Sequence, residues 1–260
     1  MHVAKLLCTL TAVILLDACQ LNTRTAIAPA RPGHPAESPL PASSQAWRWQ
    51  GGSRQLTLPG SSAQQKRTLV DVLARTDTAE TTALLLAANS ALKLKRIDDA
   101  GFLYNAAQVR HTQDLARFPP LDAERPWLQR IDALRVDTGK QVSSALLDTP
   151  KAYDRVAKRL ASWRCETRQD YLPAWRSRHQ RAAGDCQALS RERASALQDI
   201  ATLMDIPSYA EAARLARYYL NGSASVRALP GLKEQYRDAL AEMQRIERNK
   251  GLYGLSTRMR

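Results

Sequence analysis

Histidine is the residue type in this chain that could most readily act as a general base, and His34, His111 and His179 occur beyond residue 20. A hydrolase needs a nucleophile and an orienting group close to such a base. The chain contains neither a G-x-S-x-G nor an H-E-x-x-H pattern. We therefore expect His111 and His179 to occupy surface or capping positions, and we predict no catalytic residue.

Two groups of acidic residues could also take part in acid–base chemistry. Asp137-Thr138-Gly139 resembles the catalytic loop of aspartic proteases, but Lys140 replaces the small hydroxyl residue of that loop and the flanks are helical. We expect Gly139 to end a helix instead. Asp98 and Asp99 lie at an expected helix start, where carboxylates interact favourably with the helix dipole. We predict a structural role for this pair.

The first 20 residues have the pattern of an export signal. A positively charged start precedes an apolar run of about 11 residues, Leu6–Leu16, which is too short to span a membrane comfortably. Leu16-Asp17-Ala18-Cys19 follows and resembles the lipobox of bacterial lipoproteins, from which Asp17 departs. The resemblance implies that residues 1–18 are a lipoprotein signal peptide and that Cys19 is lipidated. Since Gln20 is not aspartate, it also implies an outer-membrane lipoprotein of the cell envelope that faces the periplasm.

An ordinary secretory signal with a chance cysteine is the alternative, and either signal places the chain in an oxidising compartment. With Cys8 in the signal and Cys19 carrying lipid, one pair remains, Cys165 and Cys186. Such a pair is expected to form a disulfide. Two free thiols are the alternative. A metal site is weakly supported because only His179 lies between the cysteines, and we predict neither a metal nor a cofactor.

Residues 19–60 are predicted to be a tether. Prolines at five positions between Leu21 and Gln45 favour an extended linker that would hold the folded part away from the membrane. Trp47 and Trp49 then precede Gly51-Gly52. This pattern allows a small hairpin across the glycines or an irregular arm whose tryptophans pack on the helical part.

Residues 61–260 are predicted to form a single helical domain, because apolar residues recur there at helical spacing. The last residues, Leu252–Arg260, are basic and expected to fray. The expected helices are Gln64–Arg75, Thr78–Leu94, Asp98–Ala116, Trp127–Val136, Gln141–Leu147, Pro150–Cys165, Gln187–Met204, Tyr209–Leu220 and Leu232–Asn249.

The second and third expected helices resemble a tetratricopeptide-type pair. Ile97-Asp98-Asp99-Ala100, Tyr104 and Ala107 fall where that motif has its turn and its second-helix contacts, whereas Ala87-Ala88 and Ala91 depart from it. The resemblance implies a helix-turn-helix solenoid, although three such repeats cannot be counted. The predicted fold class is therefore all-α, either an irregular multi-helix bundle or a short solenoid of about eight or nine helices.

The segment from residue 163 to residue 181 is the predicted interaction surface, because it interleaves aromatic and basic residues of the types enriched in binding hot spots. The alternative is that its tryptophans belong to the core and its arginines are solvated. The residues are Trp163, Arg164, Arg168, Tyr171, Trp175, Arg176, Arg178, His179 and Arg181.

The formal net charge of +13 bears on partners rather than on fold. We expect the chain to associate with the membrane through the lipid anchor. We also expect a protein partner, and the positive charge of the chain is compatible with an acidic surface on that partner. Nucleic acid is not expected. The favoured hypothesis is a protein-binding module, in one version an immunity-type inhibitor of an envelope-targeting effector. The alternative is a structural or assembly factor of an envelope or secretion complex, and the third hypothesis is a cell-wall or lipid-acting enzyme.

Overall fold

A computed structural model describes residues 47–50, 53–56, 60–166, 171, 173, 175, 181–182 and 184–258 of the chain. The predicted signal peptide, Cys19 and the proline-rich stretch lie outside these residues. All described residues belong to one compact unit that spans Leu40–Arg260. None of the helices in this described part is long and apolar enough to cross a membrane.

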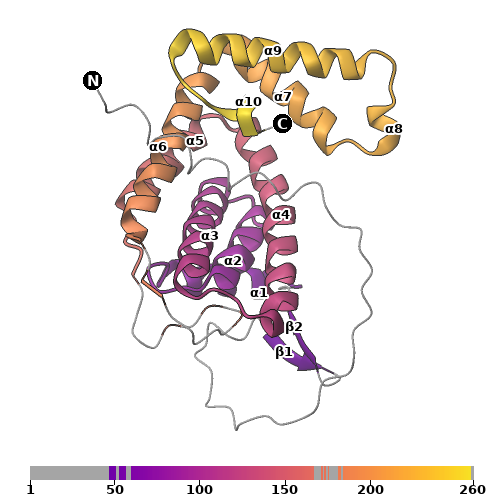
Figure 1. The fold of residues 1–260 in the computed structure, drawn as a ribbon. Coiled ribbons are helices and arrows are strands. Elements are labelled where there is room, and N and C mark those ends of the chain that lie inside the picture. Colours follow the sequence, from indigo (N-terminus) through magenta and orange to yellow (C-terminus); the bar gives the residue numbers. More distant parts are fainter. Residues whose placement is uncertain are drawn as a thin grey trace, which may run out of the picture. The chain divides into compact units, whose positions relative to one another are not determined.

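Ten α-helices and one 3₁₀ helix, Asp122–Glu124, follow in the described part beyond residue 60 (Figure 1), so the predicted all-α multi-helix bundle is confirmed. A short antiparallel hairpin, β1 (Trp47–Gln50) and β2 (Ser53–Leu56), precedes them. The helices are α1 (Ser62–Leu73), α2 (Thr81–Lys93), α3 (Ile97–Arg117), α4 (Arg125–Asp148), α5 (Lys151–Ser162), α6 (Cys186–Met204), α7 (Pro207–Asn221), α8 (Ala224–Arg227), α9 (Leu232–Lys250) and α10 (Leu255–Arg258).

Helix α2 forms the centre of the bundle. Every residue from Thr81 to Ala91 is buried, because α1, α3 and α4 all pack around this helix. A helix that is apolar on all sides is stable only when it is enclosed in this way. Small residues such as Ala87 and Ala88 are fully buried and allow the axes of α2 and α3 to approach closely.

Helix α4 is continuous where the sequence predicts a break. The prediction that Gly139 ends a helix is wrong, and the two expected helices around residues 137–139 are one. A Cβ atom at Gly139 would lie 2.2 Å from the hydroxyl oxygen of Tyr104 in α3. Glycine at this position therefore allows α4 and α3 to pack closely, and it does not end the helix.

The C-terminal segment packs on the bundle, so the expected fraying is wrong for its described residues. Leu255 and Ser256 are buried. The carboxylate of Glu247 accepts hydrogen bonds from the hydroxyls of Tyr209 and Ser256 and, at 3.1 Å, from the backbone N–H of Ser256. These bonds join α7, α9 and α10 through one buried acid.

Replacing Gly139 with alanine tests the contact between α4 and α3. We expect Gly139→Ala to lower the free energy of unfolding by about 1–3 kcal/mol, because the new methyl group would overlap Tyr104. The cost should shrink by about 1 kcal/mol or more in a Tyr104→Leu background, which lacks the overlapping atoms. Urea denaturation measures both effects.

Gly184→Ala is the matched control, because nothing lies within 4 Å of a Cβ atom at this exposed glycine. Equal destabilisation by Gly139→Ala in the two backgrounds would contradict the proposed overlap.

Candidate functional site

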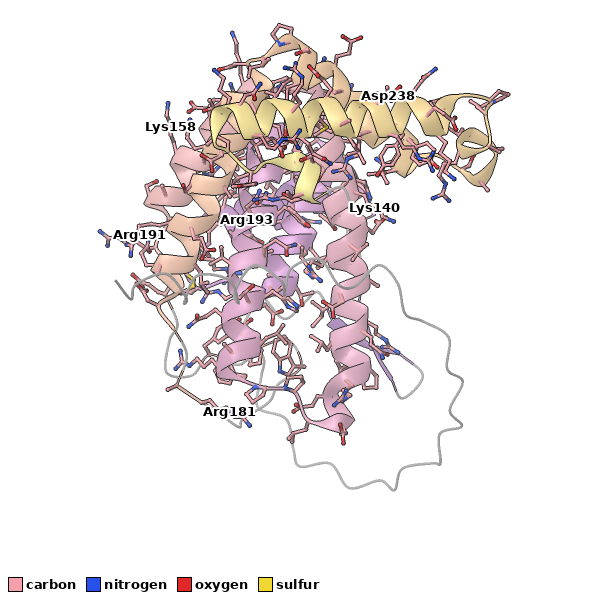
Figure 2. The ribbon with its side chains drawn as sticks, turned by 45° about the horizontal axis from the view of Figure 1, so that its top comes forward. Lys140, Lys158, Arg181, Arg191, Arg193 and Asp238 are labelled. Atoms are coloured by element: carbon pink, nitrogen blue, oxygen red, sulfur yellow. A yellow bond between two sulfur atoms is a disulfide. The ribbon has the colours of Figure 1, made fainter. Side chains whose placement is uncertain are left out.

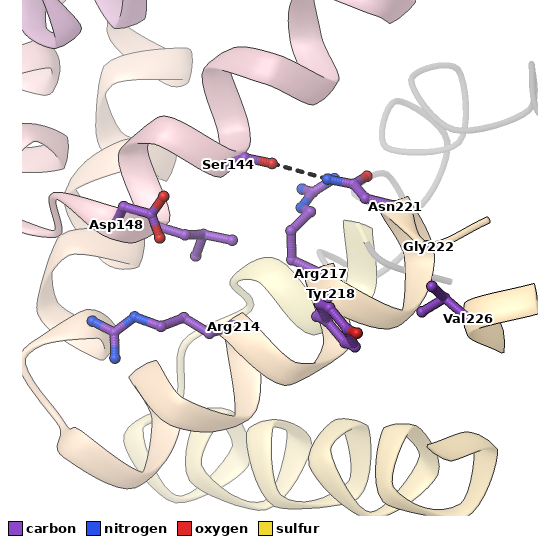
Figure 3. A pocket seen from close by; sticks show the side chains of 9 residues that line it. Ser144, Asp148, Arg214, Arg217, Tyr218, Asn221, Gly222 and Val226 are labelled. Carbon is purple, nitrogen blue, oxygen red and sulfur yellow. Dashed lines mark hydrogen bonds between the residues drawn. The ribbon is translucent and has the colours of Figure 1, made fainter. Parts of the chain in front are cut away.

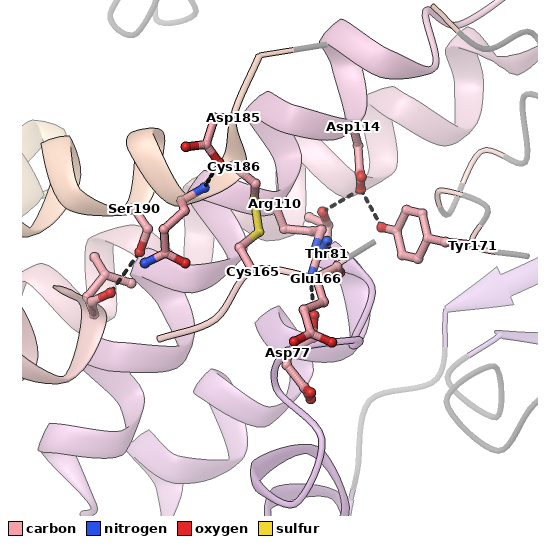
Figure 4. The surroundings of a disulfide bond; sticks show 12 residues. Asp77, Thr81, Arg110, Asp114, Cys165, Glu166, Tyr171, Asp185, Cys186 and Ser190 are labelled. Carbon is pink, nitrogen blue, oxygen red and sulfur yellow. Dashed lines mark hydrogen bonds between the residues drawn. A yellow bond between two sulfur atoms is a disulfide. The ribbon is translucent and has the colours of Figure 1, made fainter. Parts of the chain in front are cut away.

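Cys165 and Cys186 form a disulfide in the structure, with Cα atoms 5.7 Å apart (Figure 4). The bond joins the segment after α5 to the first residue of α6, where Asp185 caps the helix by accepting from the backbone N–H of Gln187. The cross-link closes a chain segment with a sequence separation of 21. Closing a loop of this size stabilises the fold by about 3 kcal/mol in the chain-entropy treatment.

A buried guanidinium, that of Arg110 in α3, lies next to this disulfide (Figure 4). It donates hydrogen bonds to the carbonyl oxygen of Glu166, at 2.8 Å, and to that of Asp77. The backbone N–H of Glu166 also donates to the Asp77 carbonyl, at 3.1 Å. The guanidinium carbon lies 5.8 Å from the ring centroid of Trp163 and 5.4 Å from that of Tyr171. One charge therefore connects α3, the α1–α2 turn and the segment after α5.

Asp114 lies about one turn beyond Arg110 and is also buried. Its carboxylate accepts hydrogen bonds from the hydroxyls of Tyr171, at 2.7 Å, and Thr81, at 3.1 Å. Burial raises the pKa of Asp114 to about 6, although these hydrogen bonds and the charge of Arg110 oppose the rise. The segment after α5 is thus held by a hydrogen bond to a carboxyl group that titrates near neutral pH.

The predicted interaction surface is wrong for its two tryptophans. Trp163 and Trp175 are 5% and 2% exposed, and Trp175 donates its indole N–H to the Phe118 carbonyl at 2.8 Å. Tyr171 is half-buried. These aromatic side chains fill the space beside α3, which explains why the segment contains them. Arg164 and Arg181 are exposed, and the other four predicted residues, Arg168, Arg176, Arg178 and His179, lie outside the described residues.

The residues that the sequence offered for acid–base chemistry, His111, Asp98 and Asp99, form contacts that hold the helices together. His111 is buried rather than on the surface, with its Nε2 atom 3.2 Å from a carboxylate oxygen of Asp132. Asp98 accepts two hydrogen bonds from Arg155 in α5, at 2.6 and 2.8 Å. Asp99 accepts one from Arg159 at 2.7 Å. The acidic pair lies in the first turn of α3, as predicted, and fastens that turn to α5.

A groove lies between the C-terminal half of α4 and the pair α7–α8. It consists of two neighbouring cavities of about 310 and 450 Å³ that share Ser144, Asn221 and Gly222. The side-chain amide of Asn221 donates to the hydroxyl of Ser144 at 2.9 Å, which ties α7 to α4. We call these two cavities the α4–α7 groove.

Four of the thirteen residues that line the α4–α7 groove are basic. Figure 3 shows Ser144 and Asp148 of α4 on one side and Arg214 and Arg217 of α7 on the other. Lys140 and Arg227 line the larger cavity. Asp148 is the one carboxylate among the residues that line the two cavities. The groove therefore favours a ligand with negative charge.

Local backbone chemistry shapes the end of this groove. Helix α7 ends at Asn221, and Gly222 turns the chain into α8. A Cβ atom at Gly222 would lie 2.7 Å from a methyl carbon of Val226. Glycine thus permits the tight turn that brings Arg227 beside α4.

Comparisons with known proteins give no relative: no family model matches the chain, and neither a curated protein nor a solved structure matches it significantly. Within the described residues, no cluster of three His, Cys, Asp or Glu side chains could hold a metal ion. The arguments about function therefore rest on this chain's own residues.

Sequence reasoning missed Arg110 and Asp114, yet a signal was present. Arg110 follows Leu103, Ala106 and Ala107 at helical spacing, which places the charge on the apolar face of its helix. A charged residue on such a face must be paired or hydrogen-bonded when it is buried. The groove residues, in contrast, come from segments that are more than 60 positions apart and carry no local pattern.

Replacing Asp114 with asparagine tests the titration of the buried carboxyl group. The pKa of Asp114 is higher in the folded chain, so its contribution to stability is present at low pH and lost as the pH rises through about 6. Asparagine keeps an acceptor for Thr81 and Tyr171 but cannot ionise. We expect the difference in unfolding free energy between variant and wild type to shift by about 2–3 kcal/mol in favour of the variant between pH 4 and pH 8.

Urea denaturation at a series of pH values measures this difference. Asp122→Asn, at an exposed carboxylate, should follow the wild type throughout. An Asp114→Asn profile parallel to the wild-type profile would refute the assignment.

Proposed function

We propose that the protein is a tethered binding module whose α4–α7 groove receives an acidic segment of another protein. The observation that carries this proposal is the lining of the groove, which holds one carboxylate, Asp148, and four basic side chains, Lys140, Arg214, Arg217 and Arg227. Complementary charge raises association rates and discriminates between partners.

The groove is built mainly on packed helices, which suits a binding site better than a catalytic site on a mobile loop. Its lining residues belong to α4, α7 and α8 and to the turn at Gly222. Sites built on packed helices keep their geometry when the partner arrives. Lys140, Arg214 and Arg227 are exposed, so a partner could reach them without rearrangement of the fold.

The proposal places this module at the cell envelope. The lipobox-like sequence that ends at Cys19 would anchor the chain to the outer membrane, facing the periplasm, and the prolines after it would form the tether. The disulfide between Cys165 and Cys186 fits an oxidising compartment. In one version the module is an immunity-type inhibitor of an envelope-targeting effector. A structural or assembly factor is the alternative version.

Charge reversal in the groove tests the binding proposal. The wild-type chain and a double variant that carries both Lys140→Glu and Arg227→Glu are captured in parallel from detergent-solubilised envelopes. We expect a partner that is enriched in acidic residues to be retained by the wild type and reduced at least tenfold for the variant, because rim charges govern encounter and orientation. Quantitative mass spectrometry measures the ratio.

The matched control is Lys158→Glu, Arg191→Glu, which makes the same charge change on α5 and α6, away from Lys140 (Figure 2). A partner lost equally from both variants, or retained by both, would rule out the groove as the binding site. Deletion strains then separate the two versions: death only beside competitors supports the inhibitor, and intrinsic envelope defects support the assembly factor.

Mass spectrometry of membrane-extracted protein tests the anchor separately. We expect the mature chain to begin at Cys19 and to carry acyl groups there, because the lipobox-like sequence places the cleavage before this cysteine. Cys19→Ser should abolish acylation and release the protein from the membrane fraction. An uncut leader with an unmodified Cys19 would contradict the proposed anchor.

A further inference from the structure

The two cavities of the α4–α7 groove differ in the chemistry of their walls. The walls of the smaller cavity expose mostly apolar atoms, whereas those of the larger cavity expose polar and apolar atoms in similar amounts. Leu147, Tyr218 and Val226 line the smaller cavity and not the larger one. Lys140 and Arg227 line only the larger one. The groove therefore joins a mostly apolar cavity to a more polar, basic one.

The three apolar side chains of the smaller cavity come from three helices. Leu147 of α4 is 2% exposed, so packing in the core fixes its position. Val226 of α8 is half-buried, and its methyl carbon lies close to Gly222. Tyr218 of α7 is 54% exposed. Figure 3 shows Tyr218 and Val226 on the α7–α8 side of the cavity. Packing thus holds two of the walls, and the third is an exposed ring that a ligand can cover.

Two arginines also line the smaller cavity. Arg214 lies one turn of α7 before Tyr218, and Arg217 directly precedes this tyrosine. The methylene groups of arginine pack against apolar surfaces while the guanidinium stays in a polar environment. The cavity therefore suits an apolar side chain whose neighbours along its own chain are acidic.

The volume of the smaller cavity limits what it can hold. Its volume is about 310 Å³, at the lower end of the roughly 300–1,000 Å³ of cavities that enclose whole small ligands. One bulky side chain fits such a space. Large aromatic side chains that fill apolar pockets supply much of the affinity at protein interfaces. The larger cavity, of about 450 Å³, shares Ser144, Asn221 and Gly222 with the smaller one and provides room for the residues beside that side chain.

We propose that the acidic segment in the groove carries one aromatic side chain, which lies between Leu147, Tyr218 and Val226. The carboxylates beside it then reach Lys140 and Arg227. Burial of the ring supplies affinity, and the charges supply orientation. This inference rests on the proposed function and names the kind of segment that the groove selects. A segment with acidic residues alone would leave the apolar cavity without a matching group.

Fluorescence anisotropy of the full chain with labelled peptides tests the proposed aromatic side chain. The first peptide alternates glutamate and serine around one central phenylalanine. The second has alanine in place of the phenylalanine, and the third has glutamine in place of every glutamate. We expect the first peptide to bind saturably and the second to bind about tenfold more weakly or worse, because the ring is lost. The third should also bind more weakly than the first, because its charges are lost.

Tyr218→Ala tests where the ring binds. We expect this variant to bind the phenylalanine peptide about threefold more weakly or worse and the alanine peptide nearly as the wild type does, since only phenylalanine contacts the tyrosine ring. Tyr253→Ala is the matched control, because its ring is 75% exposed and lines neither cavity. It should bind every peptide as the wild type does. Both variants should unfold at the wild-type temperature, because both rings are exposed.

The peptides separate the aromatic side chain from the charges. The double variant that carries Lys140→Glu and Arg227→Glu should weaken both glutamate peptides to the same extent. Equal binding of the phenylalanine and alanine peptides, with both weakened in this double variant, would overturn the inference and leave the proposed function standing. Equal binding of the first and third peptides would instead refute the proposed acidic partner. No saturable binding of the phenylalanine peptide, or an equal loss of it in Tyr218→Ala and Tyr253→Ala, would also overturn the inference.

Discussion

The fold depends on the buried guanidinium of Arg110 and on the backbone carbonyls that it binds. Helix α3 makes the most extensive contact with α2, and it also packs against α4, α5 and α6. Arg110 fixes to this helix two segments that are far apart in sequence, the turn at Asp77 and the segment at Glu166. Loss of either carbonyl would remove a hydrogen bond from a buried charge, which costs more than the loss of a hydrogen bond at the surface. The disulfide and the Asp114 carboxyl group hold the same segment from its two sides.

Helices were the part of the structure that sequence predicted best, because apolar periodicity reports directly on the buried face. The pair α2–α3 and the helices α6, α7 and α9 lie close to the predicted ranges. The prediction at Gly139 was wrong because sequence alone does not distinguish a glycine that ends a helix from one that makes room for a side chain of another helix. The close approach of the Tyr104 hydroxyl becomes visible only when α3 is placed beside α4. The basic composition of residues 252–260 suggested fraying, but the buried acceptor Glu247 that holds this segment is visible only in three dimensions.

The same limit applies to the candidate site. The sequence drew attention to residues 163–181, where aromatic and basic residues alternate, but the structure uses Trp163 and Trp175 to fill the core beside α3. Lysine and arginine exceed aspartate and glutamate by 38 to 25, so the opposite charges cannot pair one to one. Composition cannot say where those cations gather. Packing of α4 against α7 decides it, and brings Lys140, Arg214, Arg217 and Arg227 to the lining of one groove.

The central claim is that the α4–α7 groove receives an acidic segment of another protein between its basic side chains. Photo-crosslinking in intact envelopes, with the crosslinker placed at exposed position 227 and, for reference, at exposed position 191, tests it most directly. The account predicts adducts to an acidic segment of a partner from position 227 and none to that segment from position 191. Equal adducts from the two positions, or none from position 227, would contradict it.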